Sequence, residues 1–472
     1  MRITFWGAAR KVTGSMFLLE LESDFRILID CGMDMDSEGE DMPVYPGSVF
    51  PFEASMINVV ILTHAHLDHT GKVPNLIREG FEGPIFCTAP TTDLAEILLY
   101  DAASINKSKL NKYHKRKGQS PGYKPNFNLE EIFQEKHVKQ ALSQVKSLAV
   151  NKTYKLTKSI NLKMISTGHL LGAANVFLEI EENNEKKSIL FSGDIGRQNY
   201  PLLKDPETPP QADYVICETT YGGKYHQSLV DTEEELLSFI QKSCIEKPGK
   251  LIIPAFSIGR TQAILYTINK LFREKRLPDI PVYADSPMAM KSNRVYEAFS
   301  NHFNEESTTF KKKYGELFYG NNFDYIEQLG ESKKISTKQG PCIIVSSSGM
   351  LEGGRIQHHI RMNLQNPDTT ILMVGFTPEG TFGHKLRNAP GVIEMGKKNV
   401  PINATILNTD AFSGHGDHDD LLRFIHSQKK ENTKGVFLVH GEETSMDNFK
   451  EALIEDGYQN VVTPSKGESF TL

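Results

Sequence analysis

Short apolar runs, separated by polar and turn-forming residues, fill the N-terminal part of the chain. Their length and composition are typical of strands, and helical periodicity appears between several of them. We predict strands at 2–6, 15–20, 25–30, 57–62, 84–87, 153–156, 160–166 and 187–192, and helices at 73–80, 90–106 and 129–144. This alternation predicts a domain of the α/β class.

The pattern changes after a proline-rich stretch at 200–212, which we interpret as a boundary. Longer strand–helix units follow it, and their regular alternation predicts a parallel sheet. From a strand at 402–408 onward, the chain returns to the first pattern. We therefore expect an α/β domain that is interrupted by a second α/β domain.

A dense group of histidines follows directly after the apolar run at 57–62. His64, His66, Asp68 and His69 lie within six consecutive positions, on the loop that we expect at the end of that strand. A strand end presents its side chains into one small volume, and imidazole with carboxylate suits zinc. The alternatives are a His-rich surface loop and histidines that serve only the structure.

Three more polar residues are predicted at strand ends, two of them beside a glycine and one two positions before a glycine. His169 follows the strand at 160–166, and Asp194 follows the strand at 187–192. Together with the histidine group, these two residues complete a candidate dinuclear site. Asp30 closes the strand at 25–30, and its type fits either a turn former or a group that orients a metal-bound histidine.

Charge and cysteine content restrict the classes of function. The net charge is −6, so nucleic acid would have to bind in a local basic cleft. Residues 107–118 carry six basic side chains, which we interpret as a solvated loop, with phosphate contact as the alternative. The five scattered cysteines indicate reduced thiols of a cytoplasmic protein. No apolar segment is long enough to cross a membrane, and the N-terminus lacks a signal-peptide pattern.

A loop of small residues, 346–355, opens a predicted helix. Such a loop can hold phosphate through its backbone N–H groups. It lacks the Gly-Lys-Ser/Thr ending of a P-loop, which argues against binding of a nucleoside triphosphate.

The order of these motifs resembles a known family. The histidine group, then His169, then Asp194, preceded by Asp30, resembles the metallo-β-lactamase motifs. Glu218, the Ser-Gly-Met-x-x-Gly-Gly-Arg stretch, Ser413-Gly-His415 and Val439-His440-Gly-Glu resemble the β-CASP group. The chain is similar over essentially its whole length to bacterial and archaeal relatives of the endonuclease subunit of the cleavage and polyadenylation specificity factor.

The resemblance implies an αββα metallo-β-lactamase sandwich with an inserted β-CASP domain. The first part of the sandwich would comprise 1–204, the insertion 205–401, and the C-terminal part of the sandwich 402–472. These bounds agree with the changes in pattern near both points.

The resemblance also implies ligands for two Zn²⁺ ions. One zinc would be held by His64, His66 and His169, the other by Asp68, His69 and His440, with Asp194 bridging them and Asp30 orienting a ligand. Asp68 would help to position the attacking water. His415 would donate a proton to the leaving oxygen with the help of Glu218; from the residues alone, His415 could equally be a structural histidine at a glycine-rich turn.

Residues that would contact the substrate are implied with less detail. The candidates are Arg260, Ser348, Arg355, Lys385 and Ser413, and further basic residues near a cleft between the domains are Lys291, Arg294 and Arg387. The chain departs from many relatives in the glycines around His415 and in His384, where arginine is common. A histidine at position 440 resembles the RNA-processing members rather than the DNA-repair members related to Artemis.

The expected function is a zinc-dependent ribonuclease that cleaves single-stranded RNA internally, with 5′-exonuclease action as a further mode. The expected partners are single-stranded RNA and a second copy of the chain, with no membrane. The alternatives are a small-molecule hydrolase, a DNA nuclease and a non-catalytic subunit of a processing complex. The inserted domain is larger than a small ester needs, and every metal position is filled, which disfavours the first and last alternatives.

Overall fold

The structure is a computed structural model, and it describes residues 1–34, 48–120, 122–125, 127–226, 231–375, 377, 380–396 and 398–472. These residues form two compact units. The first unit contains 1–198, 205–225 and 415–472, and the second contains 199–204 and 226–414.

The first unit is built on two seven-stranded sheets. In spatial order, the first sheet consists of β22 (Glu468–Thr471), β1 (Arg2–Gly7), β2 (Met16–Glu20), β3 (Arg26–Ile29), β4 (Val59–Ile61), β5 (Ile85–Thr88) and β6 (Val145–Leu148). The second consists of β21 (Val461–Val462), β20 (Gly435–Val439), β11 (Tyr214–Glu218), β10 (Glu185–Phe191), β9 (Ala174–Glu182), β8 (Ile160–Ser166) and β7 (Thr153–Lys155).

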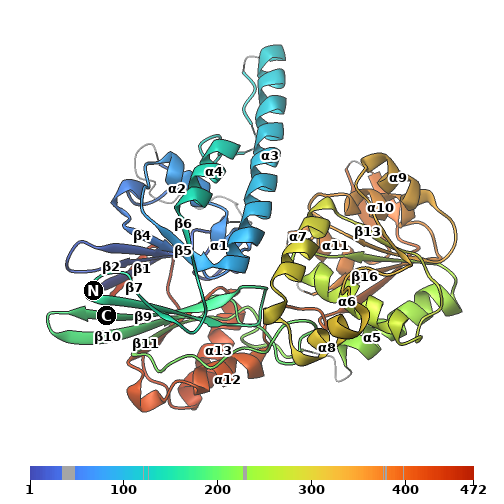
Figure 1. Ribbon diagram of the computed structural model, residues 1–472. Coiled ribbons are helices and arrows are strands. Elements are labelled where there is room, and N and C mark those ends of the chain that lie inside the picture. Colours follow the sequence, from blue (N-terminus) through green and yellow to red (C-terminus); the bar gives the residue numbers. More distant parts are fainter. Residues whose placement is uncertain are drawn as a thin grey trace. The chain divides into compact units, whose positions relative to one another are not determined.

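Helices cover the outer face of each sheet of this unit (Figure 1). The two sheets enclose a core that includes Ile3, Phe5, Leu162 and Phe191. On the outside of the first sheet lie α2 (Val73–Arg78) and α4 (Glu135–Gln144), and on the outside of the second lie α12 (His418–His426) and α13 (Glu443–Glu455). The unit is therefore the αββα sandwich that the sequence predicts.

Short helices complete the first unit, together with one long helix. The short ones are η1 (Ala54–Met56), α1 (Leu67–Thr70) and η4 (Lys430–Asn432). The long helix α3 spans Ala89–Gln119 without a break. The prediction of a loop at 107–118 is therefore wrong, because the lysines and arginine of this stretch are good helix formers and continue the helix that begins at Ala89.

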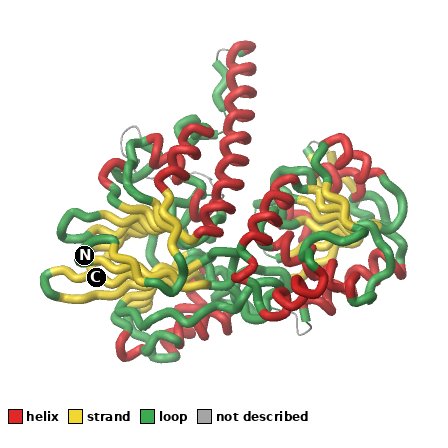
Figure 2. Tube along the Cα trace, viewed as in Figure 1, coloured by secondary structure: helices red, strands yellow, loops and turns green. Residues whose placement is uncertain are grey.

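The second unit is built on a parallel six-stranded sheet (Figure 2). Its strands, in spatial order, are β14 (Phe323–Tyr325), β13 (Val282–Asp285), β15 (Cys342–Ser346), β12 (Lys250–Pro254), β16 (Thr369–Val374) and β19 (Thr405–Thr409). Between β16 and β19 in the sequence, β17 (Val392–Met395) and β18 (Lys398–Pro401) form a separate two-stranded sheet. The helices are α5 (Thr232–Ile240), η2 (Gln241–Glu246), α6 (Arg260–Arg273), α7 (Pro287–Ala298), η3 (Ser300–His302), α8 (Glu305–Tyr314), α9 (Leu329–Thr337), α10 (Ile356–Asn363) and α11 (Phe382–Arg387).

The boundaries of the units differ from the expected bounds at 204/205 and 401/402. Residues 205–225 belong to the first unit because β11 pairs with β10 and β20 of its second sheet. Residues 402–414 belong to the second unit because β19 pairs with β16. In the described parts of the chain, none of the helices has both the length and the hydrophobicity that crossing a bilayer requires.

Candidate metal centre

Parallel strands place the candidate ligands at one edge of the first unit. In the second sheet, β10, β11 and β20 are parallel neighbours, and each is followed or ended by a candidate residue: Asp194, Glu218 and His440. Two antiparallel pairings, through β9, make β8 parallel to β10, so His169 emerges at the same edge. In the first sheet, β3 and β4 are parallel and lead to Asp30 and to the histidine group.

One group of ligand atoms converges from three loops. Nε2 of His64 lies 3.0 Å from Nδ1 of His66, and Nε2 of His169 lies 3.3 Å from the same atom. Both of these Nε2 atoms lie 3.4 Å from Oδ2 of Asp194. The four side chains offer one ligand atom each toward a common point.

A second group of ligand atoms lies near Oδ1, the other carboxylate oxygen of Asp194. Nε2 of His69 is 3.2 Å from Oδ1 of Asp194 and 3.3 Å from Nε2 of His440. Nε2 of His440 is in turn 3.5 Å from Oδ2 of Asp68. Asp194 therefore faces one ligand group with each of its two oxygens, which is the position of a bridging carboxylate.

These distances fit metal ligands better than hydrogen bonds. At a zinc–nitrogen distance of about 2.05 Å, tetrahedral geometry places neighbouring ligand atoms about 3.3 Å apart. Neutral imidazole has one N–H and one lone pair, so nitrogens that face each other cannot all be paired. Oδ1 of Asp194 is buried and has no hydrogen-bond partner, and a buried polar atom of this kind is expected where a cation binds. The residues present therefore fit a metal cofactor.

Burial and charge favour, in four of the ligands, the protonation states that metal binding needs. Burial, reinforced by neighbouring histidines, holds the pKa of His64 well below its usual value. Burial also lowers the pKa of His66 to about 4, against the nearby carboxylates. Burial alone would raise the pKa of Asp68 and of Asp194, but the surrounding histidines lower it, for Asp68 to about 2. Ionised carboxylates and neutral imidazoles are the forms that bind zinc.

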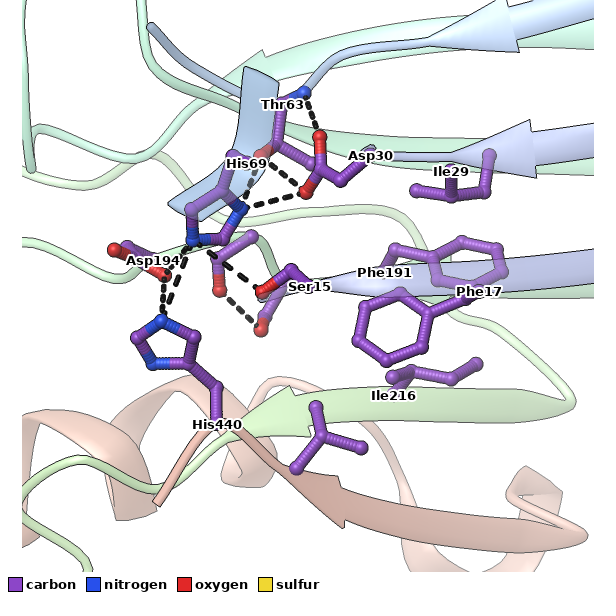
Figure 3. A pocket seen from close by; sticks show the side chains of 13 residues that line it. Ser15, Phe17, Ile29, Asp30, Thr63, His69, Phe191, Asp194, Ile216 and His440 are labelled. Carbon is purple, nitrogen blue, oxygen red and sulfur yellow. Dashed lines mark hydrogen bonds and ion pairs between the residues drawn. The ribbon is translucent and has the colours of Figure 1, made fainter. Parts of the chain in front are cut away.

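Asp30 and Thr63 orient His69 (Figure 3). Nδ1 of His69 lies 2.7 Å from Oδ2 of Asp30, so its N–H donates to this carboxylate and Nε2 is left as the ligand atom. Asp30 also accepts hydrogen bonds from the backbone N–H and the hydroxyl of Thr63, both at 2.8 Å. Burial opposes protonation of His69, but Asp194 and Asp30 outweigh it and raise its pKa.

Thr220 plays the same part for His440, and the sequence did not single it out. Its Oγ1 lies 3.0 Å from Nδ1 of His440, which turns Nε2 toward Asp194. The hydroxyl also lies 3.2 Å from the carbonyl oxygen of His440, to which it donates. His440 has a φ of 50°, a conformation that few residues other than glycine adopt and that this hydrogen bonding supports. In the sequence, the only indication that Thr220 orients His440 is its position two residues after Glu218.

His415 and Glu218 form a pair beside the ligands. Nδ1 of His415 lies 3.1 Å from Oε1 of Glu218, and Nε2 lies 3.9 Å from Oδ2 of Asp194. Glu218 is held by the backbone N–H groups of Ile195 at 2.7 Å and Thr220 at 3.1 Å. Burial lowers the pKa of His415, but the charge and hydrogen bond of Glu218 outweigh it, so the pKa lies above its usual value.

Most ligands of the centre are buried, and three of its residues are partly exposed. His64, His69, His169, Asp194 and His440 are buried. The side chains of Asp68 and His415 remain 22% and 18% exposed, and His66 is also partly exposed. A substrate would therefore approach the ligands past these three residues.

Close backbone packing fixes the histidine loop on its neighbours. The backbone N–H of Cys31 donates to the carbonyl of His69 at 2.8 Å, and that of Ser15 donates to the carbonyl of Asp68 at 2.8 Å. A Cβ on Gly32 would lie 1.7 Å from this Asp68 carbonyl. Glycine at position 32 is therefore required for the loop to sit where it does.

The predicted substrate residues lie in the second unit. Arg355 donates to Asp285 at 2.7 Å and to the carbonyl of Ile326 at 2.8 Å. Arg260 donates to the carbonyl of Phe412 at 3.1 Å and stacks on Phe256. The hydroxyl oxygen of Ser348 is buried, and so is the whole of Ser413. Lys385 is exposed.

Three family models match: a metallo-beta-lactamase superfamily domain at 18–203, a Beta-Casp domain at 261–386, and a Zn-dependent metallo-hydrolase RNA specificity domain at 399–464. The metallo-β-lactamase-fold protein YhfI from Bacillus subtilis is a solved structure with a TM-score of 0.25 and 16% identity, covering 47% of this chain and 72% of its own.

Relatives match over nearly the whole chain. Ribonuclease TTHA0252 of Thermus thermophilus is 33% identical over 446 residues, 94% of each chain. Transcription termination factor FttA of Methanocaldococcus jannaschii is 29% identical, covering 96% of this chain and 69% of the relative. An RNase J-like protein of the same organism is 29% identical, covering 93% and 92%.

The fold and the centre together define a metal-dependent hydrolase with a metallo-β-lactamase sandwich. Within this class, the chain belongs to the β-CASP family, of which Ribonuclease TTHA0252 is a member.

Proposed function

We propose that the chain is a zinc-dependent ribonuclease that hydrolyses phosphodiester bonds within single-stranded RNA. The observation that carries the proposal is the placement of the His415–Glu218 pair beside two ligand groups that share Asp194. The RNA specificity model supports RNA as the substrate, because its match at 399–464 includes His415 and His440. The names of two relatives, a ribonuclease and an RNase J-like protein, point the same way.

Two zinc ions per chain are part of the proposal. His64, His66 and His169 would hold one, Asp68, His69 and His440 the other, and Asp194 would bridge them. When bound, the ions would lower the pKa of water and stabilise negative charge on the attacked phosphate.

The side chains of the protein supply the proton transfers. Asp68, ionised and partly exposed, would accept a hydrogen bond from the attacking water and orient it. His415 would hold a proton on Nε2, the nitrogen that does not face Glu218, and give it to the departing 3′-oxygen. The P–O3′ bond breaks, and the products carry a 3′-hydroxyl and a 5′-phosphate.

The cellular context and the assembly state are also proposals. We infer an intracellular, cytoplasmic protein, which is supported by five cysteines that are all buried and unpaired. We also infer a homodimer, which sedimentation velocity of the zinc-loaded protein would test.

The test is cleavage of a uniform single-stranded RNA and of the matching DNA by the zinc-supplemented protein, with product ends mapped. The His66→Ala and His415→Ala variants serve as controls. The proposal predicts RNA cleavage that both variants lose, and product lengths separate internal cutting from stepwise trimming.

Other outcomes would contradict the proposal. Equal or faster cleavage of the DNA would indicate a DNA nuclease. Full cleavage by His66→Ala would show that the activity does not depend on the assigned ligands and comes from another site or another protein. No cleavage by protein that holds two zinc ions would favour a small-molecule hydrolase or a non-catalytic subunit.

A further inference from the structure

The C-terminal part of α3 concentrates positive charge in a chain whose net charge is negative. Between residues 107 and 117 the helix carries six cations and no carboxylate, whereas the whole chain has a net charge of −6. We call residues 107–117 the cationic arm. Its cations are Lys107, Lys109, Lys112, Lys115, Arg116 and Lys117.

The cations of the arm are free to meet a partner. All six are exposed, and this end of α3 extends beyond the sheets and helices of its unit (Figure 1). Among the residues that the structure describes, no carboxylate forms an ion pair with any of them. Within the described residues their charge is therefore left to solvent ions, and these would be released when a polyanion binds.

Stability of the helix does not account for this charge. Arg116 and Lys117 lie in the last turn, where a cation interacts favourably with the helix dipole. Lys107, Lys109 and Lys112 lie before that turn. Lys109 and Lys112, and Lys112 and Lys115, are three positions apart on the helix, so these like charges repel each other. The repulsion indicates that the lysines serve a purpose other than folding.

Aromatic rings anchor the end of the arm. Tyr113 is buried and packs against the rings of Tyr123 and Phe127. Arg116 donates to the hydroxyl of Tyr123 at 2.9 Å, and Lys109 lies over the ring of Phe127 at 5.8 Å. The segment that follows α3 thus supports the helix and leaves the charged ends of its side chains in water.

The distribution of side chains favours nucleic acid over a membrane. A membrane-bound helix needs an apolar face, whereas in the arm every residue except Leu110 and Tyr113 is exposed. At 100° per residue, the six cations point in directions all around the helix axis. A flexible phosphate backbone can contact such a surface from any side.

The base of α3 is tied to the loop that carries a metal ligand. The hydroxyls of Thr88 and Thr91 donate to the carbonyl of Gly172, at 2.6 and 3.0 Å, three positions beyond His169. At a rise of 1.5 Å per residue, Lys107 lies about 27 Å along the helix from Ala89. An RNA cleaved at the centre could therefore reach the arm only with nucleotides far from the scissile bond.

We propose that the cationic arm is a second binding site for the phosphate backbone of long single-stranded RNA. It would bind nucleotides of the substrate that lie far from the metal centre. It would not recognise particular bases, because lysine contacts phosphate as a point charge. The proposal rests on the proposed function for the identity of the polyanion, but the arm acts on binding and not on chemistry.

The experiment compares two charge-matched variants. In the arm variant, Lys109, Lys112, Lys115 and Lys117 are changed to glutamine, which keeps a good helix former at each exposed position. In the control variant, the exposed Lys146, Lys152, Lys155 and Lys158 of the same unit are changed to glutamine. Both are made in the full chain, with and without His66→Ala, so that binding is measured without cleavage.

The probes are oligouridylates of about 40 and about six nucleotides, because single-strand sites usually span several nucleotides. For the longer RNA, we expect the arm variant to bind about tenfold more weakly at 0.1 M salt, with a salt dependence shallower by about 3 in log–log slope. The shorter RNA should bind and be cleaved as by the unchanged protein, and the control variant should match the unchanged protein with both.

Several results would overturn the proposal. Unchanged binding of the longer RNA by the arm variant is one, and an equal loss in the control variant is another. Loss of binding to phosphatidylserine vesicles or to polyglutamate, with RNA binding intact, would assign the arm to a membrane or to an acidic protein. If the protein binds RNA through the arm but cleaves none, the proposed function fails and the inference about the arm stands.

Discussion

Nδ1 of His415 lies 3.1 Å from Oε1 of Glu218, although 197 positions of sequence separate the two residues. Glu218 is fully enclosed and is itself held by two backbone N–H groups. The hydrogen bond determines which nitrogen of His415 is free. Nε2 faces the metal ligands and is the only atom of the ring that can give a proton to a substrate there.

The His415→Ala variant tests this role. We expect kcat to fall by about 10²- to 10⁴-fold, the usual contribution of a general acid, while zinc content is unchanged. Single-turnover cleavage of RNA and zinc analysis of the same sample measure both. A fall in kcat that only follows loss of zinc would show that His415 serves the metal and not the leaving group.

Glu218→Gln should act through His415. Glutamine keeps the size of the side chain but removes its charge, so we expect a loss of about 10- to 100-fold in kcat, as for other groups that orient a functional histidine. The double variant Glu218→Gln/His415→Ala should be no slower than His415→Ala alone. Losses that multiply in the double variant would mean that the two residues act independently.

Asp30→Asn tests the orientation of His69. The variant weakens the hydrogen bond that turns Nε2 of His69 inward, so zinc affinity should fall by about 10- to 100-fold. Competition with a chelator measures this affinity. Asp24→Asn, at an exposed position before the same strand, is the control and should bind zinc normally. Unchanged affinity in Asp30→Asn would show that Asp30 serves only the turn.

Asp285 makes the stability of the second unit depend on pH. Burial raises the pKa of this carboxyl, but hydrogen bonds from His359, Ser332 and Arg355 outweigh burial and lower it. Since the folded pKa is below the unfolded value of 3.8, the stabilisation is complete above that pH and is lost as pH falls through the folded pKa.

We therefore expect Asp285→Asn to reduce the free energy of unfolding at pH 7 by about 3 kcal/mol, the usual cost of breaking a buried pair. The difference from the unchanged protein should shrink as pH falls below about 4. Urea unfolding of the metal-free protein, followed by circular dichroism, measures it, with the exposed Asp324→Asn as control. A gap that stays constant from pH 7 to acid would contradict this account.

The same network resembles a nucleophilic triad. Oγ of Ser336 lies 2.8 Å from Nδ1 of His359, whose Nε2 lies 2.6 Å from Oδ2 of Asp285. All three residues are at most 1% exposed, so no substrate can reach the hydroxyl. We expect Ser336→Ala to lower stability by about 1–3 kcal/mol through the unpaired His359 and to leave RNA cleavage unchanged. Loss of cleavage in a variant that is still folded would reveal a second active site.

Much of the centre could be predicted because its residues follow strands. His64, His66, Asp68 and His69 fall within six positions, so spacing alone indicates a site, although Asp68 and His69 lie in the short helix α1 and not on the expected loop. The strand-end position of His169 and Asp194 follows from the apolar runs before them. The hydrogen bonds of Thr63 and Thr220 could not be predicted in this way. They depend on the registers of neighbouring strands that are far apart in sequence, such as β11 and β20.

The differences from the sequence prediction have similar causes. The run of basic residues after 107 has no apolar stripe, so periodicity did not indicate a helix, although helix propensity continues α3 to Gln119. The strand at 405–409 has an ordinary strand pattern, and only its pairing with β16 assigns it to the second unit.

The most direct test of the central claim is a zinc titration of metal-free protein, followed by single-turnover cleavage of RNA. The account predicts that cleavage rises to a plateau at about two zinc ions per chain, because both ligand groups must be filled for hydrolysis. The His66→Ala variant should show no plateau in the same range. Full cleavage by the metal-free protein, or full cleavage in His66→Ala, would contradict the assignment of the two ligand groups as the site of hydrolysis.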